Sequence, residues 1–323
     1  MPKITDIVGH QVQLKQLQDD LGHENVSHAY LFAGNDHLGK MTVARRFASQ
    51  LLSQGVEPDE LEKVQNQIEK LVHPDLLVLD QLWIEDICED WDVIAKTSNV
   101  SQQHRAKKPP AKTNIISIDD IRVLQDRLYE TGTGTWRCCI IRSVERMQDA
   151  AANAFLKILE EPPAGLVFLL TTQSTSALLP TIVSRTRVMT FHTPPHEQLL
   201  PLLTDFSEDD AQFILHLAQG APGTIITLRD NSDLLRAERL MHSKALSFWR
   251  SQSLRERVQL LSPLHKRGEE SDQFIMHLAM ALREQAPTRP LPATRALTEL
   301  IEGLNTNAHR QLIAQRFALA ITR

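Results

Sequence analysis

Three residues near the start of the chain have the spacing of a phosphate-binding loop. Gly34, Gly39 and Lys40 fit the pattern GxxxxGK[S/T], and they stand between an apolar run and a helical pattern, as that motif requires. The glycines let backbone N–H groups surround phosphate oxygens at a helix N-terminus, and the lysine neutralises their charge. The last position departs from the pattern, because Met41 has no hydroxyl that could hold Mg²⁺. Thr42 does not replace it, since one residue along a helix is a rotation of about 100°.

A second position that should serve magnesium is also changed. A carboxylate is expected at the end of the third apolar run, where it coordinates the ion through water and helps to polarise the attacking water, but the chain has Arg142 there. Both departures remove groups that would bind Mg²⁺, and both groups serve the same reaction, nucleotide hydrolysis. Four interpretations stay open: a working ATPase, a vestigial loop that still binds nucleotide, a loop kept as an element of the fold, and a chance match.

These residues need a scaffold, and the apolar pattern predicts a parallel sheet. Five short runs are continuously apolar, which is typical of strands buried on both faces. They are 29–33, 76–79, 138–141, 166–170 and 188–191. Helical patterns separate the runs, and the segment from Ser117 to Asp120 has the form of a capping box that opens a helix to Tyr129. The alternation predicts a three-layer α/β domain with a five-stranded parallel sheet.

The pattern becomes helical in the C-terminal part of the chain. We expect an α/β domain over 1–193, a small helical lid over 194–232 and an all-α domain over 233–323. In the last domain one apolar stripe is expected to face the core. Its members are Leu234, Ala237, Leu240, Met241, Ala245 and Phe248. The segment 82–112 does not fit the alternation, and it is interpreted as a solvated insertion, with a DNA or partner contact as the alternative.

Composition narrows the class of protein. The chain has 323 residues, with 35 Lys and Arg against 40 Asp and Glu, so its formal net charge is −5. A protein that only wraps nucleic acid should be basic, so any such contact must be local or shared with partners. No apolar run approaches the roughly 20 residues of a membrane helix, and we expect a cytoplasmic location. Three cysteines without a CxxC pair predict no structural metal.

A longer block of residues carries a resemblance to a known family. Residues 148–163, followed by 168–172 and 179–186, resemble the clamp-loader branch of the AAA+ proteins. Within that branch, the degenerate phosphate loop and the missing acidic pair resemble the delta-prime family of bacterial DNA polymerase III. The segments 73–75 and 7–10 agree with this family. The likeness covers the α/β part closely and the C-terminal third only in pattern.

The resemblance implies a static subunit with an AAA+ core, a helical lid and a collar domain. It would sit in a five-membered ring with one delta and three gamma/tau copies, which uses ATP to open the sliding clamp and place it on primed DNA. It also implies that Arg185, in Ser184-Arg185-Thr186, acts in trans at the ATP site of a gamma/tau neighbour, although the family usually has cysteine where Thr186 stands. A planar, permanently charged guanidinium suits the charge that builds on a transferring phosphoryl group. The alternative interpretation is that Arg185 pairs with a nearby acid.

Further departures from the family bear on nucleotide and metal. Many relatives carry four zinc-binding cysteines before the second strand, whereas residues 55–71 contain none. Thr224 follows the lid motif 220–223 and stands where ATP-using relatives place a phosphate-sensing arginine. Thr171 or Thr172 ends the fourth strand, where a polar residue normally contacts nucleotide, and an ordinary strand-end hydroxyl is the equal alternative. We therefore expect no cofactor, with neither a magnesium nor a zinc site, and residual nucleotide binding stays open.

Three hypotheses about function follow. The leading one is a non-hydrolysing structural subunit of the clamp loader, without independent catalytic activity. The second is an ATP-hydrolysing subunit of the gamma/tau type, which needs other Mg²⁺ ligands, and the motif spacing places Asp36, Asp80 and Glu145 badly for that role. The third is a nucleic-acid-binding protein with no loader role, which has only the basic cluster 105–112 in its support.

Overall fold

The computed structural model falls into two compact units, residues 1–226 and 227–323, and each is described here by itself. The residues that it describes are 7–69, 73–79, 115–128, 134–285 and 292–322. The insertion predicted over 82–112 lies outside them.

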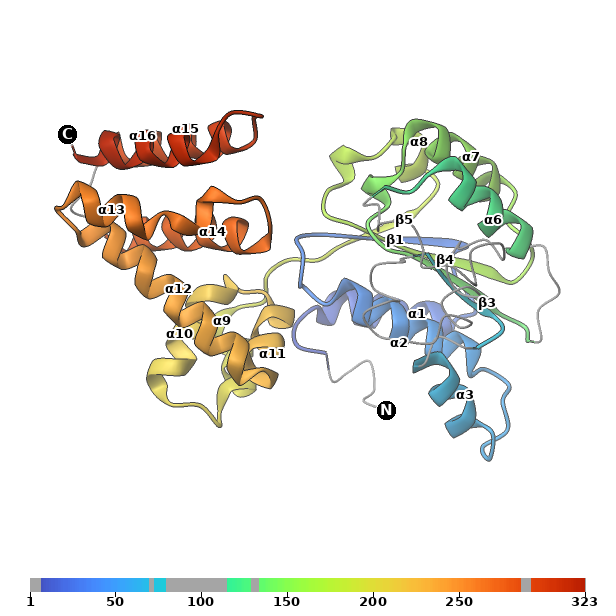
Figure 1. Cartoon of the computed structure of the whole chain (residues 1–323). Coiled ribbons are helices and arrows are strands. Elements are labelled where there is room, and N and C mark those ends of the chain that lie inside the picture. Colours follow the sequence, from blue (N-terminus) through green and yellow to red (C-terminus); the bar gives the residue numbers. More distant parts are fainter. Residues whose placement is uncertain (1–6, 70–72, 80–114, 129–133, 286–291, 323) are drawn as a thin grey trace, which may run out of the picture. The chain divides into compact units, whose positions relative to one another are not determined.

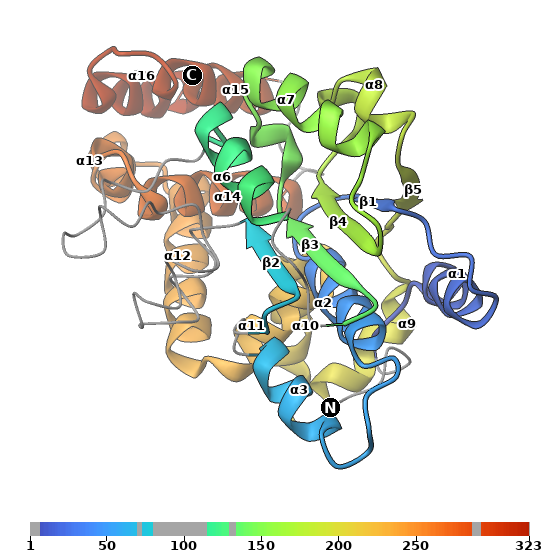
Figure 2. The ribbon, with the colours of Figure 1, turned by 90° about the vertical axis from the view of Figure 1, so that its right-hand side faces the viewer.

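A parallel sheet forms the centre of the first unit, with its strands in the order β2-β3-β4-β1-β5 (Figure 2). The strands are β1 (Ala29–Ala33), β2 (Leu76–Leu79), β3 (Arg137–Ile141), β4 (Leu166–Thr172) and β5 (Arg187–Thr190). All pairings among these strands are parallel, and Leu31 in β1 stands opposite Leu170 on one side and Val188 on the other. Every residue of β1, β2 and β4 is buried. The predicted five-stranded parallel sheet is therefore confirmed.

Helices cover both faces of this sheet (Figure 1). One face carries α1 (Gln11–Gly22), α2 (Lys40–Leu52) and α3 (Leu61–Glu69), and the other carries α6 (Ile118–Leu128), α7 (Asp149–Glu160) and α8 (Pro180–Val183). Successive strand residues point to opposite faces. Tyr30 and Phe32 therefore enter the core under α1 and α2, while Ala29 and Leu31 enter the core under α6 and α7. The result is the predicted three-layer arrangement.

The capping box predicted before α6 is confirmed. The Ser117 amide donates to Asp120 Oδ2 at 2.7 Å, and the Asp120 amide donates to Ser117 Oγ at 3.4 Å. These two bonds satisfy amides that a helix start leaves without partners. The first unit continues through α9 (His196–Leu199) and α10 (Glu208–Ala218) to the start of α11 (Pro222–Asp230). The lid over 194–232 stays a prediction.

The second unit contains helices only, among its described residues. After the end of α11 they are α12 (Ser232–Arg250), α13 (Leu254–Leu260), a short 3-10 helix (Ser262–His265), α14 (Glu269–Glu284), α15 (Pro292–Leu304) and α16 (Arg310–Thr322). Three aromatic rings meet in its core. Phe248 stacks on Phe317 with ring centroids 5.2 Å apart, and Trp249 stands edge-on to Phe317 at 5.8 Å. The buried Trp249 indole N–H donates to the Leu278 carbonyl at 2.9 Å, so its polar atom is satisfied.

The apolar stripe predicted for α12 is wrong in part. Ala245 and Phe248 are buried, but Leu240 is 60% exposed, and the buried face includes Glu238 and His242. These polar side chains are buried because α14 provides partners for them. His277 Nε2 lies 2.6 Å from Glu238 Oε2, and His242 Nε2 lies 3.0 Å from Glu284 Oε1. A stripe defined by apolar residues alone cannot include such pairs.

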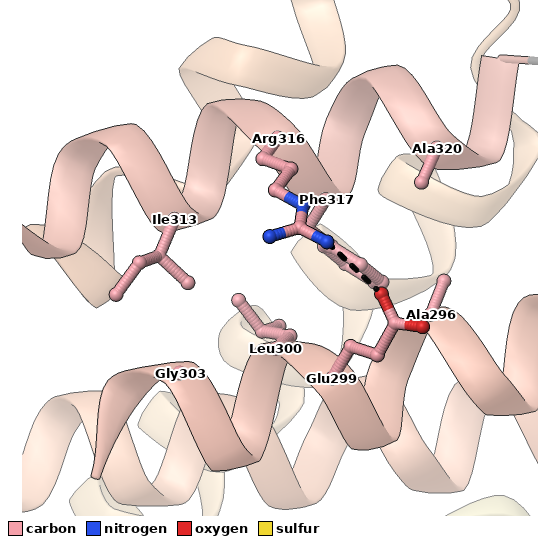
Figure 3. Close-up of a pocket in the computed structure, with 8 residues that line it drawn as sticks. All are labelled: Ala296, Glu299, Leu300, Gly303, Ile313, Arg316, Phe317 and Ala320. Atoms are coloured by element: carbon pink, nitrogen blue, oxygen red, sulfur yellow. Dashed lines mark ion pairs between the residues drawn. The ribbon is translucent and has the colours of Figure 1, made fainter. Parts of the chain in front are cut away.

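A small pocket lies between α15 and α16 (Figure 3). Its volume is about 80 Å³, and Leu300, Ile313 and Phe317 supply apolar lining. The Glu299 carboxylate and the Arg316 guanidinium approach each other across it at 3.5 Å. Pockets for drug-sized ligands usually measure about 300–1,000 Å³, so this one is too small for a nucleotide. In the described part of the chain, no helix combines the length and apolarity that crossing a membrane requires.

Candidate functional site

The predicted phosphate loop lies where β1 ends and α2 begins. Gly34 follows β1, and its amide donates to the Thr172 carbonyl at the end of β4 at 3.1 Å. Gly39 precedes α2 with φ 87°, in the left-handed region, and Lys40 is the first residue of that helix. The structure thus brings the three predicted loop residues together at the carboxyl edge of the sheet, where ligands bind in parallel α/β folds.

The Lys40 ammonium is engaged by the loop itself. Its Nζ donates to the main-chain carbonyl of Gly34 and, at 2.6 Å, to that of Asn35. The residue is only 8% exposed. Burial lowers the pKa of Lys40, the charges of Asp36 and Glu145 act to raise it, and Arg142 lowers it further. The lysine therefore stabilises the loop by bonding to main-chain carbonyls of the loop itself.

Asp36 and Glu145, whose spacing from the motif argued against a role as Mg²⁺ ligands, both lie near the phosphate loop. The Gln173 side-chain amide donates to Asp36 Oδ2 at 2.5 Å, and the Gln173 main-chain amide donates to Glu145 Oε1 at 3.3 Å. Both carboxylates act electrostatically on Lys40. Gln173 was not predicted as a site residue, because its only signal in the sequence was its place directly after the fourth strand. Asp80, the third acid considered for a metal, lies outside the described residues.

Two hydrogen bonds engage the threonine hydroxyls at the end of β4, and one of them joins β4 to the end of β3. The Ser143 amide, one residue after Arg142, donates to Thr171 Oγ1 at 3.0 Å. The Thr172 hydroxyl donates to the Ser174 carbonyl at 3.1 Å. Both threonine hydroxyls thus have hydrogen-bond partners within the chain, and the cationic residue Arg142 directly follows β3.

The tip of the phosphate loop also contacts the motif predicted at residues 220–223. The Gly223 amide, in the first turn of α11, donates to the His37 carbonyl at 2.8 Å. A Cβ atom at Gly223 would lie 2.8 Å from the same oxygen, so only glycine allows this approach. Thr224, the residue predicted to replace a phosphate-sensing arginine, follows directly and is half-buried. The motif was visible in the sequence, whereas its contact with His37 was not.

His10 links the loop to the N-terminal helix. Its Nε2–H donates to the Leu38 carbonyl at 3.0 Å, and its ring lies 4.7 Å from that of Phe191, centroid to centroid. Burial lowers the pKa of His10 below its usual 6.5, against the hydrogen bond to Leu38, which raises it, and the charge of His192 lowers it further. Neutral His10 is therefore the form that the folded protein favours.

This pKa shift predicts a loss of stability on the acid side. Below about pH 6.5 the unfolded chain takes up a proton at His10 that the folded chain resists, so the free energy of unfolding falls as the pH drops from 6.5 towards the lower pKa of the folded state. Urea unfolding at about pH 7.5 and 5.5 measures this. The variant His10→Gln keeps a donor for Leu38 and cannot titrate, so it should lose less stability between the two pH values. An equal loss in both proteins would contradict the prediction.

Arg185 lies apart from these contacts, just after α8. Its guanidinium pairs with Glu160 at the end of α7, with NH2 2.8 Å from Oε1, and its NH1 donates to the Thr181 carbonyl at 3.1 Å. The neighbouring hydroxyls close the turn, since Ser184 donates to the Thr181 carbonyl and Thr186 to the Val183 carbonyl, each at 3.1 Å. The side chain of Arg185 remains 36% exposed. The pairing with a nearby acid that the sequence left open is thus present, and Glu160 was not foreseen as the partner.

Comparison with known proteins places the chain in a family. The family model described as "DNA polymerase III, delta subunit" matches residues 9–195. The tau subunit of DNA polymerase III from Bacillus subtilis is 22% identical over 93% of this chain, and the delta' subunit from Escherichia coli is 32% identical over 43% of it. The chain spans 53% of the length of that tau subunit and 43% of that delta' subunit.

A solved structure shares the fold. A DNA polymerase III gamma subunit-related protein from Thermotoga maritima matches 95% of this chain and 98% of its own, with a TM-score of 0.55 and 20% identity. The predicted architecture, an α/β core with a five-stranded parallel sheet followed by helical parts, is confirmed. Because the family model covers more than half of its residues, the chain belongs to the DNA polymerase III delta-subunit family.

Proposed function

We propose that this chain is a non-hydrolysing clamp-loader subunit of the delta-prime type. Its family and its relatives support a place in the DNA polymerase III clamp loader. One observation carries the finer assignment: the positions that should hold magnesium carry Met41 and Arg142, and Lys40 is tied to the carbonyls of its own loop. Without metal-binding groups at these two positions, the loop has no magnesium ion to offset the charge that develops on the triphosphate during hydrolysis.

The phosphate loop then stabilises the fold and takes no part in nucleotide hydrolysis. The backbone of Gly34 packs against the carbonyl of Phe191, and the Gly223 amide donates a hydrogen bond to the carbonyl of His37. Both contacts need glycine whether or not a nucleotide is present. This supports the third of the four interpretations, a loop kept as an element of the fold.

The contribution of the subunit to hydrolysis is made at a neighbour's ATP site. Arg185 keeps a partly exposed guanidinium on the surface of the first unit, with Ser184 and Thr186 closing the turn that presents it. Placed at the ATP site of a gamma/tau neighbour, its planar fork stabilises charge on the transferring phosphoryl oxygens. The ring with gamma/tau and delta, held by the collar over 233–323, acts on the sliding clamp and primed DNA in the cytoplasm.

Co-elution tests the assignment. Mixed with separately purified gamma/tau and delta subunits, the chain should enter one complex that elutes ahead of each component in size-exclusion chromatography. A chain that stays apart from both subunits, under conditions where these two associate with each other, would contradict the proposal.

The second candidate is an ATP-hydrolysing subunit of the gamma/tau type. The match to the tau subunit spans 93% of the chain, and Asp36 and Glu145 both lie near Lys40. This candidate requires those acids to turn from Gln173 and Lys40 to a magnesium ion. Magnesium-dependent ATP turnover by the chain alone, abolished in Asp36→Asn or Glu145→Gln, would favour it.

A further inference from the structure

We propose that Glu160 is the positioning residue of Arg185, and that it fixes the guanidinium in the orientation in which it meets the neighbour's triphosphate. The inference rests on the proposed function, because it concerns the same arginine. It assigns a role in hydrolysis to an acid of this chain that touches neither the nucleotide nor the phosphate loop.

Two elements hold the guanidinium at two points. Glu160 is the last residue of α7, and its Oε1 lies 2.8 Å from Arg185 NH2. The Thr181 carbonyl in α8 accepts from Arg185 NH1 at 3.1 Å. A long side chain that is 36% exposed would otherwise sample many rotamers, and two contacts from different elements restrict it. The pair therefore limits where the fork can point.

Stability does not explain this ion pair. Its side chains are 36% and 50% exposed, and such surface pairs contribute about 0–1 kcal/mol. Glu160 and Glu161 also place two acids at the C-terminus of α7, where the helix dipole disfavours negative charge. The negative charge at this helix end is therefore unfavourable for the helix itself, and Arg185 pairs with one of the two acids, Glu160.

The geometry leaves the arginine able to bind an anion. A guanidinium has five N–H donors in a fixed fork, and the two contacts use one donor each from NH1 and NH2. The remaining donors suit phosphoryl oxygens that arrive from the neighbour. Because the fork is already oriented, the arginine loses less rotamer freedom when the transition state forms.

The test uses the reconstituted clamp-loader complex and the variant Glu160→Gln, which keeps the shape and removes the charge. At the ATP site that Arg185 serves, kcat should fall about tenfold, because misplaced catalytic groups cost up to about 100-fold. The KM for ATP should stay within about twofold, since the loss concerns the transition state rather than ground-state binding. The neighbouring acid supplies a matched control, because Glu161→Gln removes the same charge from the same helix end and should leave kcat within about twofold.

Two further variants separate failure of this inference from failure of the proposed function. If Arg185→Ala lowers kcat and Glu160→Gln does not, the positioning role is wrong and the arginine finger stands. If Arg185→Ala has no effect, the proposed function itself fails. The double variant Glu160→Gln/Arg185→Ala should match Arg185→Ala alone, because Glu160 acts through the arginine. A further loss in the double variant, or a Glu160→Gln chain that no longer co-elutes with the complex, would overturn the inference.

Discussion

If the chain acts as proposed, replacing Arg185 with alanine should leave the complex assembled and should slow hydrolysis at the neighbour's ATP site by about 1,000-fold or more. The magnitude is large because the guanidinium offsets charge that exists only in the transition state. In a single-turnover experiment on the reconstituted complex, one population of bound ATP should stay uncleaved while the remainder is hydrolysed. The first unit should keep its fold in this variant, since Arg185 lies at the surface and is 36% exposed.

Two further variants serve as controls for the effect of Arg185→Ala. Arg122→Ala removes another surface arginine of the first unit, which pairs with Asp119 at 3.1 Å, and should leave every ATP population active. Arg185→Lys keeps the charge but loses the planar fork, and should recover little of the rate. A complex with Arg185→Ala that cleaves all of its bound ATP at the normal rate would show that the finger lies elsewhere.

The second large effect concerns folding rather than hydrolysis. Gly34→Ala should lower the free energy of unfolding of the first unit by about 3 kcal/mol or more, because a Cβ at this position would lie within 3.0 Å of the Phe191 carbonyl oxygen. That contact joins two backbone segments, so neither side can move away cheaply. Thermal unfolding measures it, with an expected fall in Tm of roughly 6–12 °C for a unit of this size.

Gly39→Ala is the matched control within the same motif. Gly39 has φ 87°, but a Cβ atom added there would meet no heavy atom within 4 Å, so only the backbone conformation resists the change. The cost should be about 1–2 kcal/mol. Similar losses of stability in the two variants would mean that close packing does not require glycine at position 34. That result would contradict the proposal that the phosphate loop is kept as an element of the fold.

The sheet was predictable because its strands are buried on both faces. The runs 29–33 and 76–79 match β1 and β2 in their bounds. The runs for β3 and β4 differ by one or two residues at one end, and the run for β5 is shifted by one residue. Continuous apolar runs report burial directly. The order β2-β3-β4-β1-β5 was not predictable in the same way, because it depends on pairings between segments far apart in the chain.

Contacts between polar side chains escaped prediction for the same reason. The burial of Glu238 and His242 in α12 depends on partners in α14 that lie 39 and 42 residues further along the chain. The pairing of Arg185 with Glu160 depends on how α8 returns to α7. By contrast, the departure at Met41 was visible because a motif of fixed spacing defines that position, and the one at Arg142 because that residue directly follows an apolar run.

The most direct test of the account is ATP hydrolysis by the purified chain alone, with magnesium, in the presence and absence of primed DNA. If Met41 and Arg142 leave the loop without metal-binding groups, as proposed, the chain should show no more turnover than its own Lys40→Ala variant. Magnesium-dependent turnover that Lys40→Ala abolishes would contradict the account, because it would place a working hydrolytic site within this chain.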